Sequence, residues 1–409
     1  MALMAVPPVL LSLHTTAGLG AYGETLLIGA CLLWIGHRLL TDGGHSWLLW
    51  GAFGLLAGVG FWTFGLIAVY LFPVALLMVR KLKWRWAGRY LLCALLFVVG
   101  SAPWWWYNLT NDWAALKVFY DPGAGTAIAQ LTLGERVLGF LGLGLPALMG
   151  LRPSWSIEWV SWPLSPLILA LYLAIVVYGV RRGLSKADLG HRMLLLFIGL
   201  FCLSMIGTRF GADTSGRYML PLYVALYPLC GVWLSWLREH QRWWATVVLV
   251  FVLGFNLLGN VKAMVSEEGL TTEFWSTVRF DRTSDAALID FLLDHDLHYG
   301  YSNRHTHFRI DFLSDERVLL LPRLSSRSGL CINLDGRGDR YPAYTEQVEG
   351  SPVVFYVTTA QPYLDELLRD RYADLGITYK EEEMGPYRVF YDLSSRVSPG
   401  EMCDSEDGR

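Results

Sequence analysis

Charge is scarce in this chain and unevenly divided. Only 17% of its 409 residues are charged, whereas 54% are hydrophobic and 14% aromatic, and a soluble protein normally carries about 25% charged residues. Residues 1–264 contain 18 Lys and Arg but 9 Asp and Glu, a net charge of +9; residues 265–409 contain 15 and 27, a net charge of −12. The composition argues against an ordinary soluble enzyme and indicates a lipid-embedded part followed by a water-exposed part.

Several catalytic motifs are also missing. The sequence has no P-loop, GxSxG, HExxH or dinucleotide fingerprint, so nucleotide-driven transport and hydride chemistry have no support. His305-x-His307 with Asp311 could be read as metal ligands, but a single His-x-His pair in a loop is more typical of a surface. Residues 1–23 are uncharged, lack the basic region of a signal peptide and contain Pro7-Pro8, which interrupts a helix.

Uncharged stretches near the length of a bilayer-spanning helix, about 20 residues, dominate residues 1–264. The 37 residues between Asp42 and Arg80 suit two short spans with a turn at 61–63. Single spans are expected at 25–40, 90–111, 159–180, 193–208, 218–237 and 243–261. The short Gly- and Pro-rich stretch 137–151 suits a re-entrant segment better than a bent span. We expect a polytopic α-helical membrane domain over 1–264, with about eight to nine spans.

The distribution of Lys and Arg predicts the orientation. Basic residues collect in the loops 80–89, 181–192 and 238–242, which should therefore be cytoplasmic. Alternation then places 108–158, 208–217 and everything after 264 on the outer side. The sequence thus predicts a multi-pass protein of the cell membrane with an extracytoplasmic C-terminal domain.

Residues 265–394 read as one small α/β domain. Helices are expected at about 284–294 and 361–372, and strands at 298–301, 318–321, 353–357 and 387–391. The remaining residues, 395–409, are expected to form a disordered tail.

Two sites on the outer side could carry chemistry. Glu24 follows Tyr22 at the start of a span, where a carboxylate is often functional, although the helix dipole also favours an acid there. Arg209, Arg217 and Tyr218 belong to the outer loop that ends in RYMLPLY. Arginine suits the phosphate oxygens of a lipid headgroup; the alternative is an ion pair with Asp213 or contact with bulk lipid.

Aromatic residues are abundant on the outer side, and Trp104 and Trp105 stand in the run Trp104-Trp105-Trp106-Tyr107. Aromatic belts at the membrane interface account for most such residues. Because sugar rings stack well on aromatic faces, one or two of them suit a sugar site.

The local sequences YGETLLIGACLL at 22–33, GLLAGVGFWTFGLIAVYLFPVALL at 54–77, GSAPWWWYNL at 100–109 and GRYMLPLY at 216–223 resemble the GT-C superfamily of membrane glycosyltransferases. More narrowly, they are similar to bacterial glycosyltransferase family 39, near the protein mannosyltransferases and aminoarabinose transferases. The resemblance implies a hexosyl- or pentosyltransferase that uses a polyprenyl-phosphate sugar at the outer face, with a lipid, glycan or protein acceptor and no nucleic acid. It allows a divalent cation.

In that family an acid in the first outer loop acts as base or metal ligand. This chain is expected to lack that first span and loop, so the resemblance leaves Glu24 or another acid as the catalytic carboxylate. It further implies phosphate roles for Arg217 and Arg209, with Tyr218 near the lipid phosphate. Tyr22 and Glu24 would line the cavity, and Trp104 or Trp105 would lie against the sugar.

Two other interpretations stay open. One is a membrane protein without catalysis, a lipid-linked-sugar flippase or a scaffold; the other is an inactive, N-terminally shortened transferase. The uncharged interiors of the expected spans favour chemistry at one surface over passage through the membrane.

Overall fold

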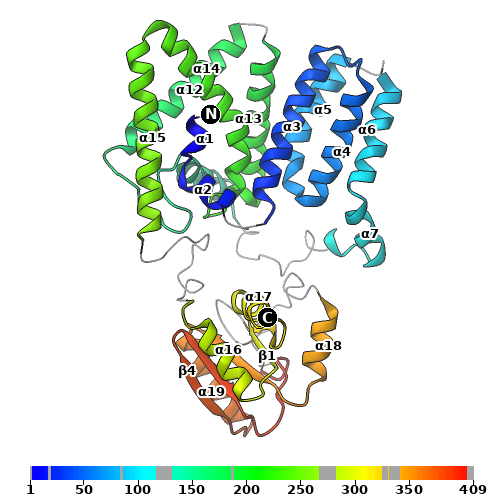
Figure 1. Cartoon of the computed structure of the whole chain (residues 1–409), viewed down its shortest axis with the longest axis vertical. Coiled ribbons are helices and arrows are strands. Elements are labelled where there is room, and N and C mark those ends of the chain that lie inside the picture. The colour runs from blue at the N-terminus through cyan, green and yellow to red at the C-terminus, as the bar shows by residue number, and fades with distance from the viewer. Residues whose placement is uncertain are drawn as a thin grey trace. The chain divides into compact units, whose positions relative to one another are not determined.

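The computed structural model describes residues 2–16, 20–82, 86–116, 131–185, 188–266, 282–324, 330 and 341–402. The described residues divide into two compact units, one within 2–266 and the other within 282–402 (Figure 1).

The first unit is helical. Its elements are α1 (Ala2–Ala5), α2 (Val9–Thr16), α3 (Tyr22–Thr41), α4 (Trp47–Thr63), η1 (Gly65–Ile67), α5 (Ala68–Leu82), α6 (Ala87–Gly100), α7 (Ala102–Thr110), α10 (Leu133–Gly139), η3 (Phe140–Gly144), α11 (Leu145–Leu148), α12 (Ser165–Ser185), α13 (Leu189–Gly207), η4 (Arg209–Ala212), η5 (Arg217–Leu222), α14 (Tyr223–His240) and α15 (Arg242–Met264).

Six helices of the described chain are long and apolar enough to cross a membrane: Tyr22–Thr41, Gly65–Leu82, Ser165–Gly183, Leu189–Gly207, Arg217–His240 and Arg242–Met264. The pair α6 and α7, bent by 61°, makes a seventh if it is one span. By length and composition the chain is a multi-pass membrane protein. The number is below the eight to nine spans expected, because α4 has only 17 residues and the segment from α10 to α11 is short and includes the π-helical turn η3.

Local chemistry explains where these helices begin and end. The side chain of Ser46 accepts a hydrogen bond from the Leu49 amide and caps α4, and Asp188 caps α13 in the same way through the Gly190 amide. Phe64 is extended, with φ −161°, and separates α4 from η1. The turn predicted at 61–63 is therefore present, one residue later.

Glycines bring neighbouring helices of the first unit close together. A Cβ atom on Gly58 of α4 would lie 2.2 Å from the carbonyl oxygen of Phe97 in α6, and one on Gly54 would lie 2.3 Å from that of Cys93. The two helices run side by side in Figure 1. In α3, Gly29 faces the ring of Tyr70 in the same way. Such small residues allow the backbone approach that favours helix association in lipid.

The helix ends that border the loops expected to be cytoplasmic lie at one end of the first unit. In Figure 1 the ends of α3, α5, α12 and α14 and the starts of α4, α6, α13 and α15 lie at the upper end, whereas α2 and α7 lie at the lower end. Arg80, Arg181 and Arg238 belong to the upper end. The arrangement agrees with the predicted alternation; the side of the membrane that each end faces stays a prediction.

The second unit is an α/β domain. Its elements are α16 (Asp285–Asp294), β1 (Tyr299–Asn303), α17 (Arg304–Leu313), β2 (Leu319–Leu324), α18 (Pro342–Gly350), β3 (Phe355–Thr359), α19 (Pro362–Asp374), β4 (Lys380–Met384) and β5 (Tyr387–Tyr391). The sheet order is β2-β1-β3-β5-β4, with β2, β1 and β3 parallel and β5 antiparallel to both neighbours.

Three elements of this unit were not expected from the sequence. The edge strand β4 reads KEEEM, and charge on both faces hides it from a search for apolar alternation. Helix α17 follows β1 without a loop, because the Asn303 side chain accepts hydrogen bonds from the His305 and Thr306 amides and starts the helix there. Helix α18 has only one buried residue, Val348.

The predicted boundary of the disordered tail, residue 395, is too early in the chain. Residues 395–402 pack on the domain: the Tyr356 hydroxyl donates to the Val397 carbonyl over 2.9 Å, and Val397 and Met402 are buried in its core. The prediction of disorder is wrong for these residues, because two isolated apolar side chains fill a surface that β3 and α19 leave open. Residues 403–409 lie outside the described chain.

Replacing Gly58 tests the close packing of α4 on α6. Gly58→Leu should lower the thermal unfolding temperature of the full chain in detergent, because the side chain would overlap a backbone carbonyl that cannot move independently; overpacking of this kind costs about 1–3 kcal/mol. Gly254→Leu in α15 is the matched control, since nothing lies within 4 Å of its added Cβ. Equal melting of both variants would contradict the packing argument.

Candidate functional site

A group of polar and aromatic side chains gathers at the end of the first unit opposite the basic loops. We call it the bundle-end cluster and define it as His14 of α2, Tyr22 at the start of α3, Asp213, and Arg217 and Tyr218 of η5. The structure thus brings together three of the predicted site residues, Tyr22, Arg217 and Tyr218.

Arg217 provides the positive charge of this cluster. Its Nη2 lies 3.5 Å from Oδ2 of Asp213, and its guanidinium lies 5.1 Å from the centre of the Tyr218 ring. The side chain remains 40% exposed, and its Nε–H has no hydrogen-bond partner in the described part of the chain. The ion pair with Asp213 was the alternative expected for this arginine, and it is present. The Nε of Arg217 is itself buried, so only the exposed remainder of the guanidinium can meet an anion.

The turn before Arg217 is stabilised by hydrogen bonds to Asp213 and by close packing on α11. Asp213 accepts hydrogen bonds from the amide and the hydroxyl of Ser215, and Gly216 is left-handed, with φ +72°, directly before η5. A Cβ on Gly216 would lie 2.7 Å from that of Ala147. Both the backbone conformation and the close approach to α11 therefore require glycine at this position.

Arg152 fastens this turn to the segment that precedes it. The side chain is only 2% exposed, and it donates to the backbone carbonyls of Leu143, Pro153, Ser156 and Thr214. Burial lowers the pKa of Arg152 to about 10, so it remains charged at neutral pH. Sequence reasoning alone missed this residue, because nothing in a lone arginine after an apolar stretch distinguishes a buried clamp from a surface charge.

Tyr22 and His14 form the wall of the cluster. Tyr22 hydrogen-bonds to Tyr218 through their side chains, and its ring meets the imidazole of His14 edge-on, with centroids 5.1 Å apart. His14 is 3% exposed and donates from Nδ1 to the Leu10 carbonyl over 2.9 Å. Burial lowers the pKa of His14, which favours a neutral imidazole with an unprotonated Nε2.

The other predicted site residues lie apart or outside the description. Glu24 is exposed and makes no hydrogen bond or ion pair with any described residue; its catalytic role stays a prediction. The Arg209 side chain lies outside the described residues, although its backbone belongs to η4. Trp104 and Trp105 are on α7, which packs on α4 and α6 away from α2 (Figure 1), so their contact with a sugar also stays a prediction.

The divalent cation allowed by the resemblance has no candidate site among the described residues, where no three His, Cys, Asp or Glu side chains are grouped to hold a metal. His305 and His307 lie on the helix α17 rather than in a loop. His307 is buried, with Nδ1 3.6 Å from Oδ2 of Asp311, which in turn accepts a hydrogen bond from the Leu320 amide. This pair connects α17 to β2.

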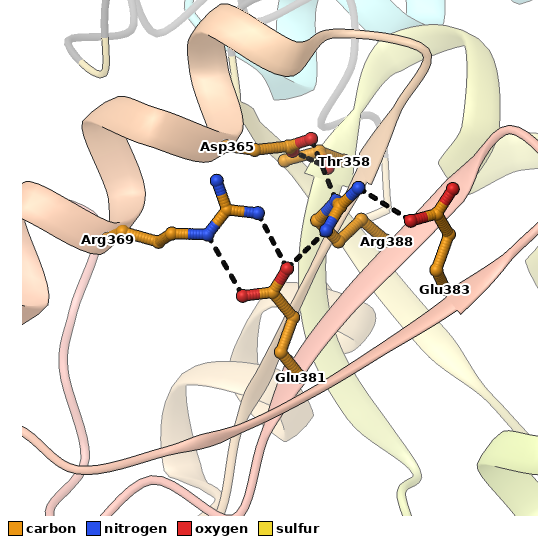
Figure 2. Close-up of polar contacts among 6 residues, drawn as sticks. All are labelled: Thr358, Asp365, Arg369, Glu381, Glu383 and Arg388. Atoms are coloured by element: carbon orange, nitrogen blue, oxygen red, sulfur yellow. Dashed lines mark hydrogen bonds and ion pairs between the residues drawn. The ribbon is translucent and has the colours of Figure 1, made fainter.

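A second polar cluster lies on the second unit, where α19 meets β3, β4 and β5 (Figure 2). Arg388 of β5 lies at its centre. Its Nε is 3.0 Å from Asp365, its Nη2 is 2.7 Å from Glu383, and its Nη1 contacts Glu381. Arg369 binds the same Glu381 with two parallel hydrogen bonds of 3.0 and 2.6 Å, and Thr358 donates to Asp365.

The charges of this second cluster are satisfied by one another, which indicates a structural role. The hydrogen bond from Arg369 lowers the pKa of Glu381, whereas burial raises that of Asp365. The stabilisation by Glu381 is therefore present above the unfolded pKa of glutamate, about 4.3, and is lost as the pH falls through the lower folded value. For Asp365 the pH dependence has the opposite sign: because its folded pKa is raised, its contribution to stability is larger at low pH and falls as the pH rises through the folded value.

Comparison of the chain with models of known protein families, with curated proteins and with solved structures gave no match.

Removing Arg388 tests whether this cluster stabilises the second unit. Arg388→Met leaves the buried Asp365 without its cation, and breaking a fully buried pair costs about 3–5 kcal/mol. Because the Arg388 side chain is 26% exposed, we expect a smaller loss, about 2 kcal/mol, in the protection of β3 and β5 amides from hydrogen exchange in the full chain. The control is Lys380→Met, whose pair with Asp392 is exposed; unchanged protection in Arg388→Met would refute the structural role.

Proposed function

We propose that this chain is a membrane glycosyltransferase of the hexosyl- or pentosyltransferase class, which moves a sugar from a polyprenyl phosphate to an acceptor at the outer face of the cytoplasmic membrane. The observation that carries the proposal is Arg217, half-exposed at the end of the bundle opposite the basic loops and held by Asp213 and Tyr218. A guanidinium at this depth suits the phosphate of a lipid carrier.

The surroundings of Arg217 favour an anion. Arg217 and Asp213 neutralise one another only in part, since the guanidinium has five donor hydrogens and the ion pair is 3.5 Å long. Arg152 adds a second positive charge beneath the turn, although its guanidinium donates to backbone carbonyls. The hydroxyls of Tyr22 and Tyr218 border the same place and hydrogen-bond to each other, which leaves one O–H of the pair to donate to a phosphate oxygen.

The reaction would be a displacement at the anomeric carbon. The acceptor oxygen forms a bond to this carbon while the bond from the carbon to the phosphate oxygen breaks, and the lipid phosphate leaves with the electron pair. Arg217 stabilises the charge that develops on the departing phosphate. The resemblance assigns the proton of the acceptor hydroxyl to Glu24 as general base; Glu24 is exposed on α3 and makes no hydrogen bond or ion pair with the bundle-end cluster.

The first test separates binding from turnover. The full chain in phospholipid vesicles is given undecaprenyl phosphate to measure binding, and undecaprenyl-phosphate mannose or aminoarabinose to measure release of the lipid phosphate. Arg217→Gln should weaken binding about 10- to 100-fold, the loss of one charged hydrogen-bonding partner. Glu24→Gln should bind normally and lose about 10²- to 10⁴-fold in turnover.

Arg238→Gln is the matched control, since it removes the same charge from the other end of η5 and α14, where the side chain is exposed. Arg217→Lys retains the charge and shows whether a loss in Arg217→Gln reflects misfolding. Binding without turnover of either sugar lipid would favour a flippase or scaffold over an enzyme. Binding that is equal in Arg217→Gln and Arg238→Gln would exclude the phosphate site.

A further inference from the structure

Helix α17 of the second unit exposes an apolar face that its fold does not use. Phe308 and Phe312, one turn apart, are 49% and 79% exposed, and the adjacent Leu313 is 47% exposed. The opposite side of the helix is buried through Thr306 and Ile310, against β1 and β2. We call the residues Phe308, Phe312 and Leu313 the α17 face. Burying one such side chain is worth about 1.5–3 kcal/mol, so a partner surface would stabilise it.

Aromatic side chains at the start of α18 lie near the end of α17. The side chain of Tyr344 hydrogen-bonds to Glu316, three residues after the end of α17, which brings the start of α18 to this end of the helix. Tyr341, 59% exposed, packs edge-on against Tyr344 with ring centroids 4.8 Å apart. Phenylalanine and tyrosine together are typical of surfaces at the boundary between headgroups and acyl chains.

The chain itself limits what can cover this face. The last candidate span, α15, ends at Met264, and the second unit is described from residue 282. The 17 residues 265–281 reach at most about 60 Å when fully extended, at about 3.5 Å each. A lipid interface is therefore always within reach of the second unit, at a high effective concentration, whereas another protein has to be recruited.

Charge indicates which kind of lipid surface fits. Residues 265–409 carry a net charge of −12, and Asp315 and Glu316 directly follow the α17 face. Anionic headgroups would be repelled, so the attraction has to come from apolar burial and not from counter-charges.

We propose that the α17 face rests in the headgroup region of the bilayer that the first unit spans, with zwitterionic phospholipid as its partner. The contact orients the second unit on the membrane surface. It is independent of the proposed transferase activity, because it rests on the exposure of the face and on the tether alone.

The test places a spin label on the face without using the native cysteines. p-Acetylphenylalanine is introduced in place of Phe312 in the full chain, coupled to a nitroxide and reconstituted in phosphatidylcholine vesicles. Power saturation then compares collisions with oxygen, which concentrates in lipid, and with a water-soluble nickel chelate. The matched control carries the label in place of Tyr363 on α19, which is 64% exposed.

A severalfold higher oxygen-to-nickel ratio at 312 than at 363 is expected, and it should persist in about 0.5 M NaCl, where charge attraction is screened within a few ångströms. Equal, water-like ratios at both positions would overturn the proposal. A ratio at 312 that falls as protein is diluted into more lipid, with loss of spin–spin broadening, would also overturn it, because a second copy of the chain would then cover the face.

Discussion

A chain that crosses a bilayer has to satisfy its backbone polar groups from within, because the lipid offers no partners. In the first unit, several buried polar side chains serve this requirement by donating to backbone carbonyls. Where Pro7-Pro8 separates α1 from α2, the amides of Asn256 and Asn260 on α15 donate to the carbonyls of Val6 and Pro7. The break is tolerated because a neighbouring helix supplies the missing hydrogen bonds.

The same rule operates at both ends of the bundle. At the basic end, the indole N–H groups of Trp50 and Trp86 and the guanidinium of Arg89 donate to the carbonyls of Gly43 and Gly44. At the opposite end, Arg152 holds four carbonyls and the Tyr223 hydroxyl donates to that of Leu148. Loops that would otherwise expose their backbone are thus kept in one conformation.

Arg217 differs from the arginines that hold backbone carbonyls. Arg152 and Arg217 lie near the same turn, but the first is buried and donates to the backbone, whereas the second is half-exposed and shares its charge with Asp213 and Tyr218. Because Arg152 fixes the turn, Arg217 is positioned without having to serve the fold. A preorganised cation at the surface of a membrane domain can then bind an anion with little reorganisation.

The second unit differs from the first in that it is rich in charged side chains and is expected to meet water rather than lipid. Some of its arginines pair with carboxylates, Arg388 with Asp365, Glu381 and Glu383 and Arg309 with Asp285. Others, such as Arg371, donate to backbone carbonyls. The acidic strand β4 is tolerated at the edge of the sheet because Arg388 and Arg369 neutralise it and because its charges discourage pairing with another chain.

The sequence by itself determined the division into two units, the approximate helices of the first and most strands of the second, since uncharged length and apolar alternation are local properties. It also pointed to Tyr22, Arg217 and Tyr218, because arginine on the outer side runs against the usual distribution of basic residues and because the sequences around them resemble those of membrane glycosyltransferases. It did not reveal α17, β4 or the packing of residues 395–402, whose local patterns are polar or irregular.

Only the tertiary structure decided that Tyr22, from the start of α3, reaches Tyr218 in η5, that His14 is buried beside them, and that Trp104 and Trp105 belong to another part of the bundle. It also separated the buried Arg152 from the exposed Arg217. The reason is physical. Burial and pairing depend on contacts between residues far apart in the chain, which form only when the helices pack, so the local sequence does not predict them.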